Sequence, residues 1–325
     1  MIHHVSKPVQ IVDRFRGCLL GLAVGDAVGT TAEFKPRGSF PEITDLCGGG
    51  PFSLNPGEWT DDTSMALCLA ESLIHCAGCD PLDQMQRYCA WQERGYMSSN
   101  GRCFDIGITV SAALDRYRRS GDPYSGSTDP RSAGNGSIMR LAPVPMAFHR
   151  HSDQLDQACI DSSRTTHGAS ECLEACVLLG RMIQRALAGQ TKEEILSGDN
   201  DGHGLKEPRI LDLSRGGYRD RPVTAIRGSG YVIHSLEAAL WCFWSSDNLE
   251  DAILMAANLG EDADTTAAVC GQLAGAHYGA SAIPDQWLQL LVQRDEIARM
   301  AERLMELSTP PASIRVDTDD EKPAG

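Results

Sequence analysis

Residues 12–29 read VDRFRGCLLGLAVGDAVG, and this stretch decides the fold. Its apolar residues recur at three- and four-residue spacing, which predicts a helix over residues 12–28. Its glycines recur at every fourth position, at Gly17, Gly21, Gly25 and Gly29. In a soluble protein such a row marks a helix face that packs very close to a neighbour, because glycine carries no side chain. Residues 267–278 (AAVCGQLAGAHY) form a second small-residue helix, which is also built for close packing.

The helical period continues along most of the chain. It predicts further helices over about residues 64–76, 82–94, 107–118, 154–164, 170–188, 231–243, 249–259 and 286–307. Residues 190–229 are polar and glycine-rich, and we expect an irregular excursion with one short helix there. No strand alternation and no internal repeat is found. The sequence therefore predicts one compact all-α domain over residues 11–307, between a flexible N-terminus (residues 1–10) and a disordered acidic tail (residues 308–325).

Charge and cysteine content narrow the class of protein. The chain has 325 residues and a formal net charge of −15, which argues against a general nucleic-acid or membrane-surface binder. No stretch is long and apolar enough to span a bilayer. The 12 cysteines are scattered, so a reduced, cytoplasmic protein is expected. Cys76 and Cys79 form a lone C-x-x-C, which is weak evidence for zinc or redox chemistry.

Two acidic clusters far apart in the chain carry the chemistry. They are residues 59–65, WTDDTSM, and residues 260–266, GEDADTT, and each lies just before an apolar helical run. Carboxylates beside threonine hydroxyls are hard oxygen ligands that suit Mg²⁺, Mn²⁺ or Ca²⁺. If the fold brings the clusters together, they can hold two divalent cations with open positions for water or substrate.

Each cluster also has a simpler interpretation. Aspartate and threonine are preferred N-caps, and acid in the first turn complements the helix dipole. Two clusters, each with one acid more than a cap needs, favour the metal interpretation. Asp26 lies among small residues and therefore needs a partner, and Glu33 is the next acid along.

Three further segments are candidates for a site. Asp105 lies near a predicted helix start, where an N-cap role is the alternative. Residues 134–137, GNGS, form a glycine-rich turn before an apolar helix-like segment, and such turns let backbone N–H groups approach phosphate oxygens. His167 lies at a junction between helices, where a purely structural hydrogen-bonding role is the alternative.

Five ordered motifs resemble those of the ADP-ribosylglycohydrolase family. They are GLAVGDAVG at 21–29, WTDDT at 59–63, GNGSIMR at 134–140, TH at 166–167 and DADT at 262–265. The segments FDIG at 104–107 and GYVIH at 230–234 look most like the bacterial dinitrogenase-reductase-activating glycohydrolase branch. The resemblance covers about residues 13 to 300.

The resemblance implies an all-α fold with a binuclear Mg²⁺ or Mn²⁺ centre. It implies metal ligands at Thr60, Asp61, Asp62, Asp262, Asp264 and Thr265. It implies that the diphosphate of ADP-ribose binds at Gly134, Asn135, Gly136 and Ser137, with His167 and Tyr231 on the side of the ribose and leaving group. The catalytic carboxylate is either Asp105 or Glu33, and Glu261 stands where many relatives carry glycine.

The resemblance therefore implies a metal-dependent hydrolase that removes mono-ADP-ribose from modified protein side chains, most simply from arginine. The expected partners are an ADP-ribosylated protein as substrate and ADP-ribose as product. Within the same class, the linkage could instead be to serine, to a nucleic acid or to a small guanidino compound. A protein that only binds ADP-ribose, or that neutralises an ADP-ribosyltransferase toxin, is a second class. A structural Ca²⁺ site in a helical protein is a third.

Overall fold

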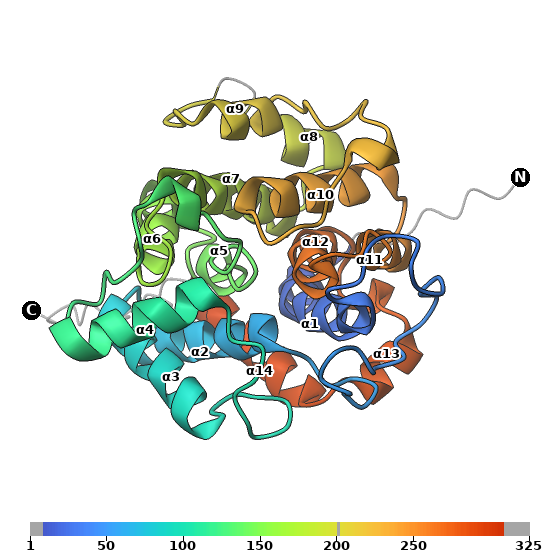
Figure 1. Ribbon diagram of the computed structural model, residues 1–325. Coiled ribbons are helices and arrows are strands. Elements are labelled where there is room, and N and C mark those ends of the chain that lie inside the picture. The colour runs from blue at the N-terminus through green and yellow to red at the C-terminus, as the bar shows by residue number, and fades with distance from the viewer. Residues whose placement is uncertain (1–8, 200–201, 309–325) are drawn as a thin grey trace, which may run out of the picture.

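The computed structural model describes residues 9–199 and 202–308. This part of the chain consists of α-helices and short 3₁₀-helices without a β-strand (Figure 1), so the predicted all-α fold is confirmed. No helix in these ranges is long and apolar enough to cross a membrane. The expected flexible N-terminus (residues 1–10) and acidic tail (residues 308–325) lie almost entirely outside the described residues.

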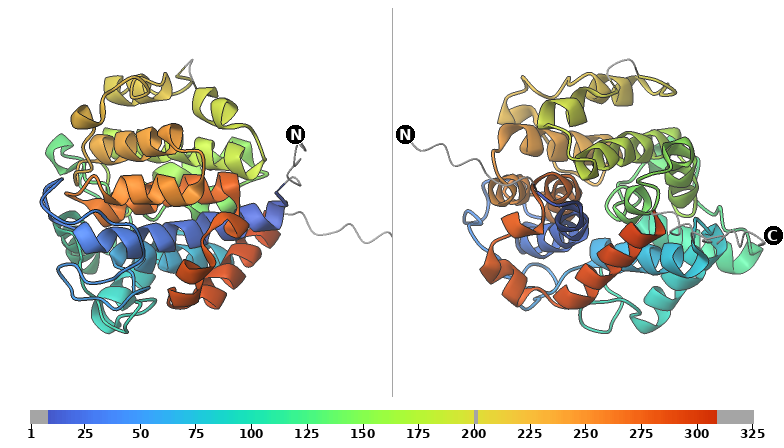
Figure 2. Two further views of the ribbon diagram at one scale, coloured as in Figure 1. Left: turned by 90° about the vertical axis from the view of Figure 1, so that its right-hand side faces the viewer. Right: turned by 180° about the vertical axis from the view of Figure 1, so that it is seen from behind.

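Two helices lie side by side at the centre of the molecule (Figures 1 and 2). They are α1 (Ile11–Gly29) and α12 (Ala263–Tyr278), and no other pair of helices shares so extensive a contact among the described residues. A Cβ atom at Gly271 would lie 2.0 Å from the carbonyl oxygen of Gly21, and one at Gly275 would lie 1.9 Å from that of Gly17. The two backbones therefore touch directly, as the glycine row predicts.

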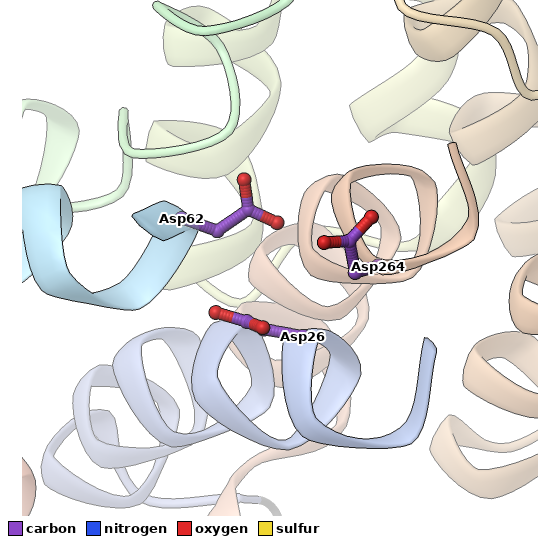
Figure 3. Close-up of side chains that lie close together, drawn as sticks. All are labelled: Asp26, Asp62 and Asp264. Atoms are coloured by element: carbon purple, nitrogen blue, oxygen red, sulfur yellow. The ribbon is translucent and has the colours of Figure 1, made fainter. Parts of the chain in front are cut away.

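The order of these contacts makes the pair antiparallel. Early residues of α1 meet late residues of α12, and Gly29 at the end of α1 faces Ala263 at the start of α12. This register brings Asp26, near the C-terminal end of α1, beside Asp264 in the first turn of α12 (Figure 3). The close backbone contact thus places two acidic residues from opposite ends of the chain next to each other.

The other helices enclose this pair. On one side lie α7 (Ser170–Leu187) and α10 (Val232–Ser245), with α8 (Lys192–Ser197) and α9 (Pro208–Ser214) outside them (Figure 1). On the other side lie α2 (Asp61–Cys76), α3 (Pro81–Arg94) and α14 (Arg294–Leu307). The remaining helices are α4 (Ile108–Ser120), α5 (Pro143–Ala147), α6 (Ser152–Arg164), α11 (Leu249–Ala257) and α13 (Asp285–Leu290).

Most predicted helices are present with small shifts at their ends, but two predictions are wrong. Residues 190–229 contain two short α-helices, α8 and α9, instead of one. The single helix expected over residues 286–307 is divided into α13 and α14. At the break, the backbone N–H of Val292 donates to the carbonyl of Gly57 (3.0 Å), and its carbonyl accepts from the indole of Trp59 (3.2 Å). The interruption supports the loop that leads into the first acidic cluster.

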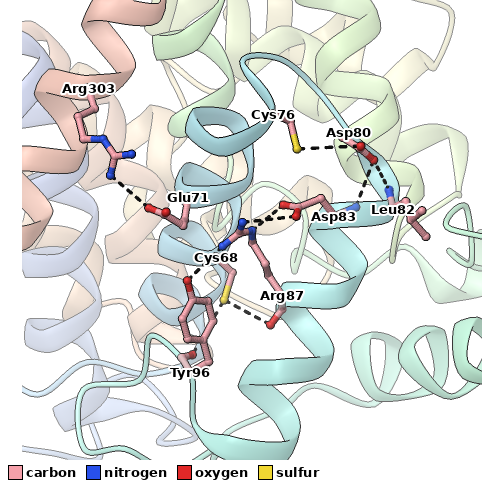
Figure 4. Close-up of polar contacts among 9 residues, drawn as sticks. All are labelled: Cys68, Glu71, Cys76, Asp80, Leu82, Asp83, Arg87, Tyr96 and Arg303. Atoms are coloured by element: carbon pink, nitrogen blue, oxygen red, sulfur yellow. Dashed lines mark hydrogen bonds and ion pairs between the residues drawn. The ribbon is translucent and has the colours of Figure 1, made fainter.

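The C-x-x-C sequence lies at the turn between α2 and α3 (Figure 4). Asp80 caps α3 by accepting from the backbone N–H of Leu82 (2.9 Å), and the Cys76 thiol is in weak contact with the same carboxylate (4.0 Å). The sulfur of Cys79 accepts a hydrogen bond from the Gln84 amide (3.3 Å). All cysteines are free thiols, and no potential metal-binding group in the described residues includes one.

The direct backbone contact yields a test by single substitutions. Gly271→Ala forces its new methyl group into the backbone of Gly21, so we expect the free energy of unfolding to fall by about 3 kcal/mol, as in overpacked cores. Gly78→Ala is the control, because a Cβ atom there meets nothing within 4 Å. Urea unfolding of both variants measures the effect. Equal stability of Gly271→Ala and the wild type would contradict the proposed contact.

Candidate metal centre and ligand cavity

A cavity of about 960 Å³ opens where the C-terminal end of α1 meets the N-terminal end of α12. It is lined by residues from segments far apart in sequence. These include Glu33, Asp61, Asp105, Gly134, Asn135, Gly136, His167, Asp262, Asp264 and Thr265. The predicted site residues Ser137 and Tyr231 are not among the lining residues, and Thr60 and Asp62 are buried behind the wall.

The two acidic clusters meet and pair reciprocally. The Thr60 hydroxyl lies 3.3 Å from a carboxylate oxygen of Asp264, and the Thr265 hydroxyl donates to Asp62 (3.1 Å). The capping alternative is wrong for both clusters. Thr60 and Asp262 are the N-cap residues of α2 and α12, but neither side chain makes a capping hydrogen bond. The Thr60 hydroxyl contacts Asp264 of the other cluster instead, and the Asp262 carboxylate accepts from Asn135.

The carboxylates form two overlapping groups that fit metal ions. Ligand oxygens of Asp26, Asp62 and Asp264 lie within 4.8 Å of one another (Figure 3), as do those of Glu33, Asp105 and Asp264. One oxygen of Asp62 and one of Asp264 are buried without any hydrogen-bond partner. A buried, unpaired carboxylate oxygen is costly, and a divalent cation compensates it. The donors are all oxygen, as Mg²⁺ and Mn²⁺ prefer.

The charge of this centre is uncompensated in the protein alone. Burial, reinforced by the neighbouring carboxylates, raises the pKa of Asp62 and Asp264 well above the usual range. Burial and the charge of Asp105 raise the pKa of Glu33 to about 9. Burial and nearby aspartates raise the pKa of Asp105 to about 7. The raised pKa values mean that these carboxylates bind protons more readily than ordinary ones, and bound cations would compete with those protons.

Asp61 and Asp262 take no part in the reciprocal pairing of Thr60 with Asp264 and of Thr265 with Asp62. Asp61 lines the cavity, and its pKa is raised by burial and by Asp105. Asp262 accepts a hydrogen bond from the Asn135 amide (2.7 Å). This bond joins the second acidic cluster to the glycine-rich turn, so the two lie at one site.

The glycine-rich turn is held from below by a buried arginine that sequence reasoning missed. Arg140 is fully buried and donates to the carbonyl of Gly136 (2.6 Å) and to the hydroxyls of Thr165 (3.2 Å) and Thr166 (2.7 Å). The expectation that this turn opens a helix is wrong, since residues 136–140 form turns and α5 begins only at Pro143. The buried guanidinium places a positive charge beneath the turn.

His167 lies against the same turn. A Cβ atom at Gly136 would lie 2.7 Å from the imidazole ring, so glycine is required there for the ring to fit. The ring nitrogen Nδ1 is 2.9 Å from the Thr166 hydroxyl, and burial together with Arg140 lowers the pKa of His167 to about 3. His167 is therefore neutral at physiological pH, and it supports the turn as well as lining the cavity.

Tyr231 occupies a different place. Its hydroxyl donates to the Glu171 carboxylate (2.7 Å) and accepts from Arg209 (2.9 Å). Its backbone forms an isolated bridge with Gly134. Tyr231 is thus close to the glycine-rich turn through its main chain. Its side chain is held by Glu171 and Arg209, neither of which lines the cavity.

Three residues at the cavity rim have backbone angles that side chains rarely adopt. Phe34, Asp105 and Glu261 have φ values of 60°, 59° and 59°. Asp105 is not an N-cap, because α4 begins at Ile108 with Gly107 as its N-cap. The backbone N–H of Phe34 donates to the carbonyl of Glu261 (2.7 Å), and the Glu261 side chain pairs with Arg227 (2.8 Å). Such strain is typical of functional sites.

Comparisons with known proteins show which family the chain resembles. The family model for ADP-ribosylglycohydrolase matches residues 7–313. ADP-ribosylarginine hydrolase Tri1 of Serratia proteamaculans is 48% identical over 91% of this chain and 80% of that protein. Its namesake in Pseudomonas putida is 45% identical over 92% of this chain and 80% of that protein.

Two further similarities extend the comparison. ADP-ribosyl-[dinitrogen reductase] glycohydrolase of Rhodospirillum rubrum is 32% identical over 92% of this chain and 98% of that protein. The chain is thus more similar to the two arginine hydrolases than to this representative of the branch indicated by the sequence motifs. A solved structure described as "ADP-ribosylglycohydrolase-related protein complex" superposes with a TM-score of 0.82 at 44% identity, over 92% of this chain and 99% of that one.

The raised pKa values predict how pH affects stability. Glu33 titrates at about 9 in the folded protein against an ordinary 4.5, and Asp105 at about 7 against 3.8. The folded state binds more protons than the unfolded state between these limits, so its stability is greatest below the ordinary values and falls as pH rises through the folded ones. We expect the metal-free protein to lose unfolding free energy from about pH 4 to about pH 9.

Urea unfolding with a chelator measures this slope. Glu33→Gln should make the slope shallower, whereas Glu42→Gln, at an exposed position, is the control and should leave it unchanged. Saturating Mg²⁺ or Mn²⁺ should remove the loss, because the cation stabilises ionised ligands. An identical slope with and without metal would refute the assignment of this cluster as a metal centre.

Proposed function

This chain belongs to the ADP-ribosylglycohydrolase family, and we propose that it hydrolyses mono-ADP-ribose from modified arginine side chains of proteins. The reciprocal pairing of the two acidic clusters is the observation behind this proposal. It leaves one buried oxygen of Asp62 and one of Asp264 without a hydrogen-bond partner, and Asp264 lines the same cavity as the glycine-rich turn. Arginine is the proposed linkage because two relatives above 40% identity are named ADP-ribosylarginine hydrolases.

We assign the cofactor as two divalent cations, Mg²⁺ or Mn²⁺. The residues that would hold them are Thr60, Asp61, Asp62, Asp262, Asp264 and Thr265. Their all-oxygen donor set and their uncompensated charge support this assignment. When bound, such cations polarise ribose hydroxyls and water as Lewis acids.

The substrate's diphosphate is assigned to the glycine-rich turn. Gly134, Asn135 and Gly136 line the cavity, and glycine allows phosphate oxygens to approach backbone N–H groups. The buried charge of Arg140 favours an anion above the turn. Asn135 also binds Asp262, so a diphosphate at the turn would place the attached ribose toward the carboxylates.

The reaction breaks the bond between the anomeric carbon of the ribose and the guanidine nitrogen. A water oxygen bonds to that carbon, one water proton leaves, and the departing nitrogen gains a proton. Asp105 and Glu33 both line the cavity. We assign Asp105 as the group that accepts the proton from water, and Glu33 as the group that donates a proton to the strongly basic guanidine.

The first test is release of ADP-ribose from an arginine-ADP-ribosylated protein. We expect release with Mg²⁺ or Mn²⁺ and none with a chelator. Asp62→Asn and Asp264→Asn should each lower kcat/KM by at least about 1,000-fold, because each removes a charged ligand at the reacting centre. Asp220→Asn, at an exposed position in the segment before α10, is the matched control and should retain full activity.

Other outcomes discriminate among the alternatives. Full activity of either ligand variant would overturn the metal role. Tight binding of ADP-ribose without turnover of the arginine conjugate would indicate a binding protein. Turnover of a serine conjugate in preference to arginine would move the proposal to an O-linked substrate.

The roles of Glu33 and Asp105 can be distinguished by using substrates with different leaving groups. Glu33→Gln should slow hydrolysis of the arginine conjugate by about 100-fold or more, but should affect a p-nitrophenyl ADP-ribose far less, because nitrophenolate leaves without a proton. Asp105→Asn should slow both substrates similarly, since both need an activated water. Steady-state kinetics of the four combinations provide the measurement. Equal losses on both substrates for Glu33→Gln would contradict its role as the acid.

A further inference from the structure

Asp26 is a carboxylate of this centre that is neither among the proposed metal ligands nor one of the two proposed catalytic residues. It projects from α1 between the glycines of the close-packed face and is fully buried (Figure 3). Its oxygens lie within 4.8 Å of those of Asp62 and Asp264, so distance alone would make it a third ligand. Its hydrogen bonds distinguish it from those two residues.

Asp26 accepts four hydrogen bonds. One carboxylate oxygen accepts from the backbone N–H (2.9 Å) and the hydroxyl (2.9 Å) of Thr60. The other accepts from the backbone N–H (3.0 Å) and the hydroxyl (2.6 Å) of Thr63. A carboxylate offers about four lone-pair positions, so none remains for a cation. Asp62 and Asp264, by contrast, each keep one buried oxygen without a partner.

The two N–H bonds explain how α2 begins. Thr60 and the first turn of α2 expose backbone N–H groups that an N-cap side chain normally accepts. The Thr60 side chain makes no such bond, and Asp26 accepts from the N–H groups of Thr60 and Thr63 instead. A side chain of α1 therefore fixes the start of the helix that carries the first acidic cluster.

The hydrogen bond from the Thr60 hydroxyl to Asp26 also sets the direction of the lone pairs on the Thr60 oxygen. That hydroxyl has one proton and two neighbours, Asp26 at 2.9 Å and Asp264 at 3.3 Å. The shorter contact takes the proton. The Thr60 oxygen then faces a carboxylate oxygen of Asp264 with a lone pair. Two acceptors in contact need a proton or a cation between them, and a bound divalent cation would fill that role.

We propose that Asp26 is a positioning residue, which holds the Thr60 proton and the N-terminus of α2 so that Thr60 and Asp62 present oxygen lone pairs to a divalent cation. This inference rests on the proposed metal centre and deepens it. Asp26 acts through Thr60 and is not itself a ligand.

The test uses Mn²⁺ binding, followed by electron paramagnetic resonance of the free ion, on the full chain. Asp26→Asn has the same shape but replaces acceptor positions with N–H donors that oppose the N–H groups of α2. We expect it to weaken Mn²⁺ binding by about 10- to 100-fold, as for residues that orient metal ligands. The control is Asp13→Asn. Asp13 also joins α1 to a distant segment, by accepting from Ser281, but at the other end of the helix, so its loss should leave Mn²⁺ affinity unchanged.

A double-mutant cycle separates positioning from ligation. Thr60→Val removes the hydroxyl through which Asp26 is proposed to act. In that background, Asp26→Asn should cost much less Mn²⁺ affinity than in the wild type, because both substitutions remove the same interaction. Fully additive losses would overturn the proposal, because they would show that Asp26 does not act through the Thr60 hydroxyl. Unchanged affinity in Asp26→Asn would also overturn it.

Two further results distinguish failure of the proposed role of Asp26 from failure of the variant to fold or of the proposed metal centre. If Asp26→Asn does not fold, Thr60→Ser should retain Mn²⁺ binding and Thr60→Val should lose it, and equal affinities would refute the role of the hydroxyl. If the wild type binds no Mn²⁺ or Mg²⁺, the proposed metal centre itself fails.

Discussion

Direct backbone contact between α1 and α12 is the constraint on which the rest of the structure depends. The carbonyl oxygens of Gly17 and Gly21 lie where a side chain on Gly275 or Gly271 would have to be, so the two backbones are in direct contact. Because the pair is antiparallel, the end of α1 is fixed beside the start of α12. Asp26 and Glu33 thereby reach the second acidic cluster, although more than 200 residues separate Asp26 from it.

The second constraint is electrostatic. Several carboxylates are buried at this junction, and their mutual repulsion opposes folding unless protons or cations compensate it. Packing energy from the surrounding helices must therefore hold the centre in place. The small-residue contact suits that task, since it leaves little freedom for the two backbones to separate. A rigid frame around repelling charges is the arrangement expected of a preorganised metal site.

Residues that hold the site are as informative as those that line it. Arg140 supports the glycine-rich turn, His167 packs beneath it, and Asn135 joins it to Asp262. The break at Val292 serves the first cluster in a similar way, because it pairs the chain with the loop around Gly57 and Trp59. A regular helix over residues 286–307 would satisfy its own backbone but would leave this loop without support.

The sequence alone determined the helical class, the glycine face of α1 and the hard-oxygen chemistry of the two clusters, because periodicity and residue type are local properties. It also indicated that Asp26 needs a partner, but not which one. Only the tertiary structure decided that Thr60 pairs with Asp264, that Asp26 accepts from Thr60 and Thr63, and that Asp105 and the two clusters are not simple caps. These contacts join residues on different helices, and the packing of α1 against α12, α2 and their neighbours fixes them, not the spacing of residues along the chain.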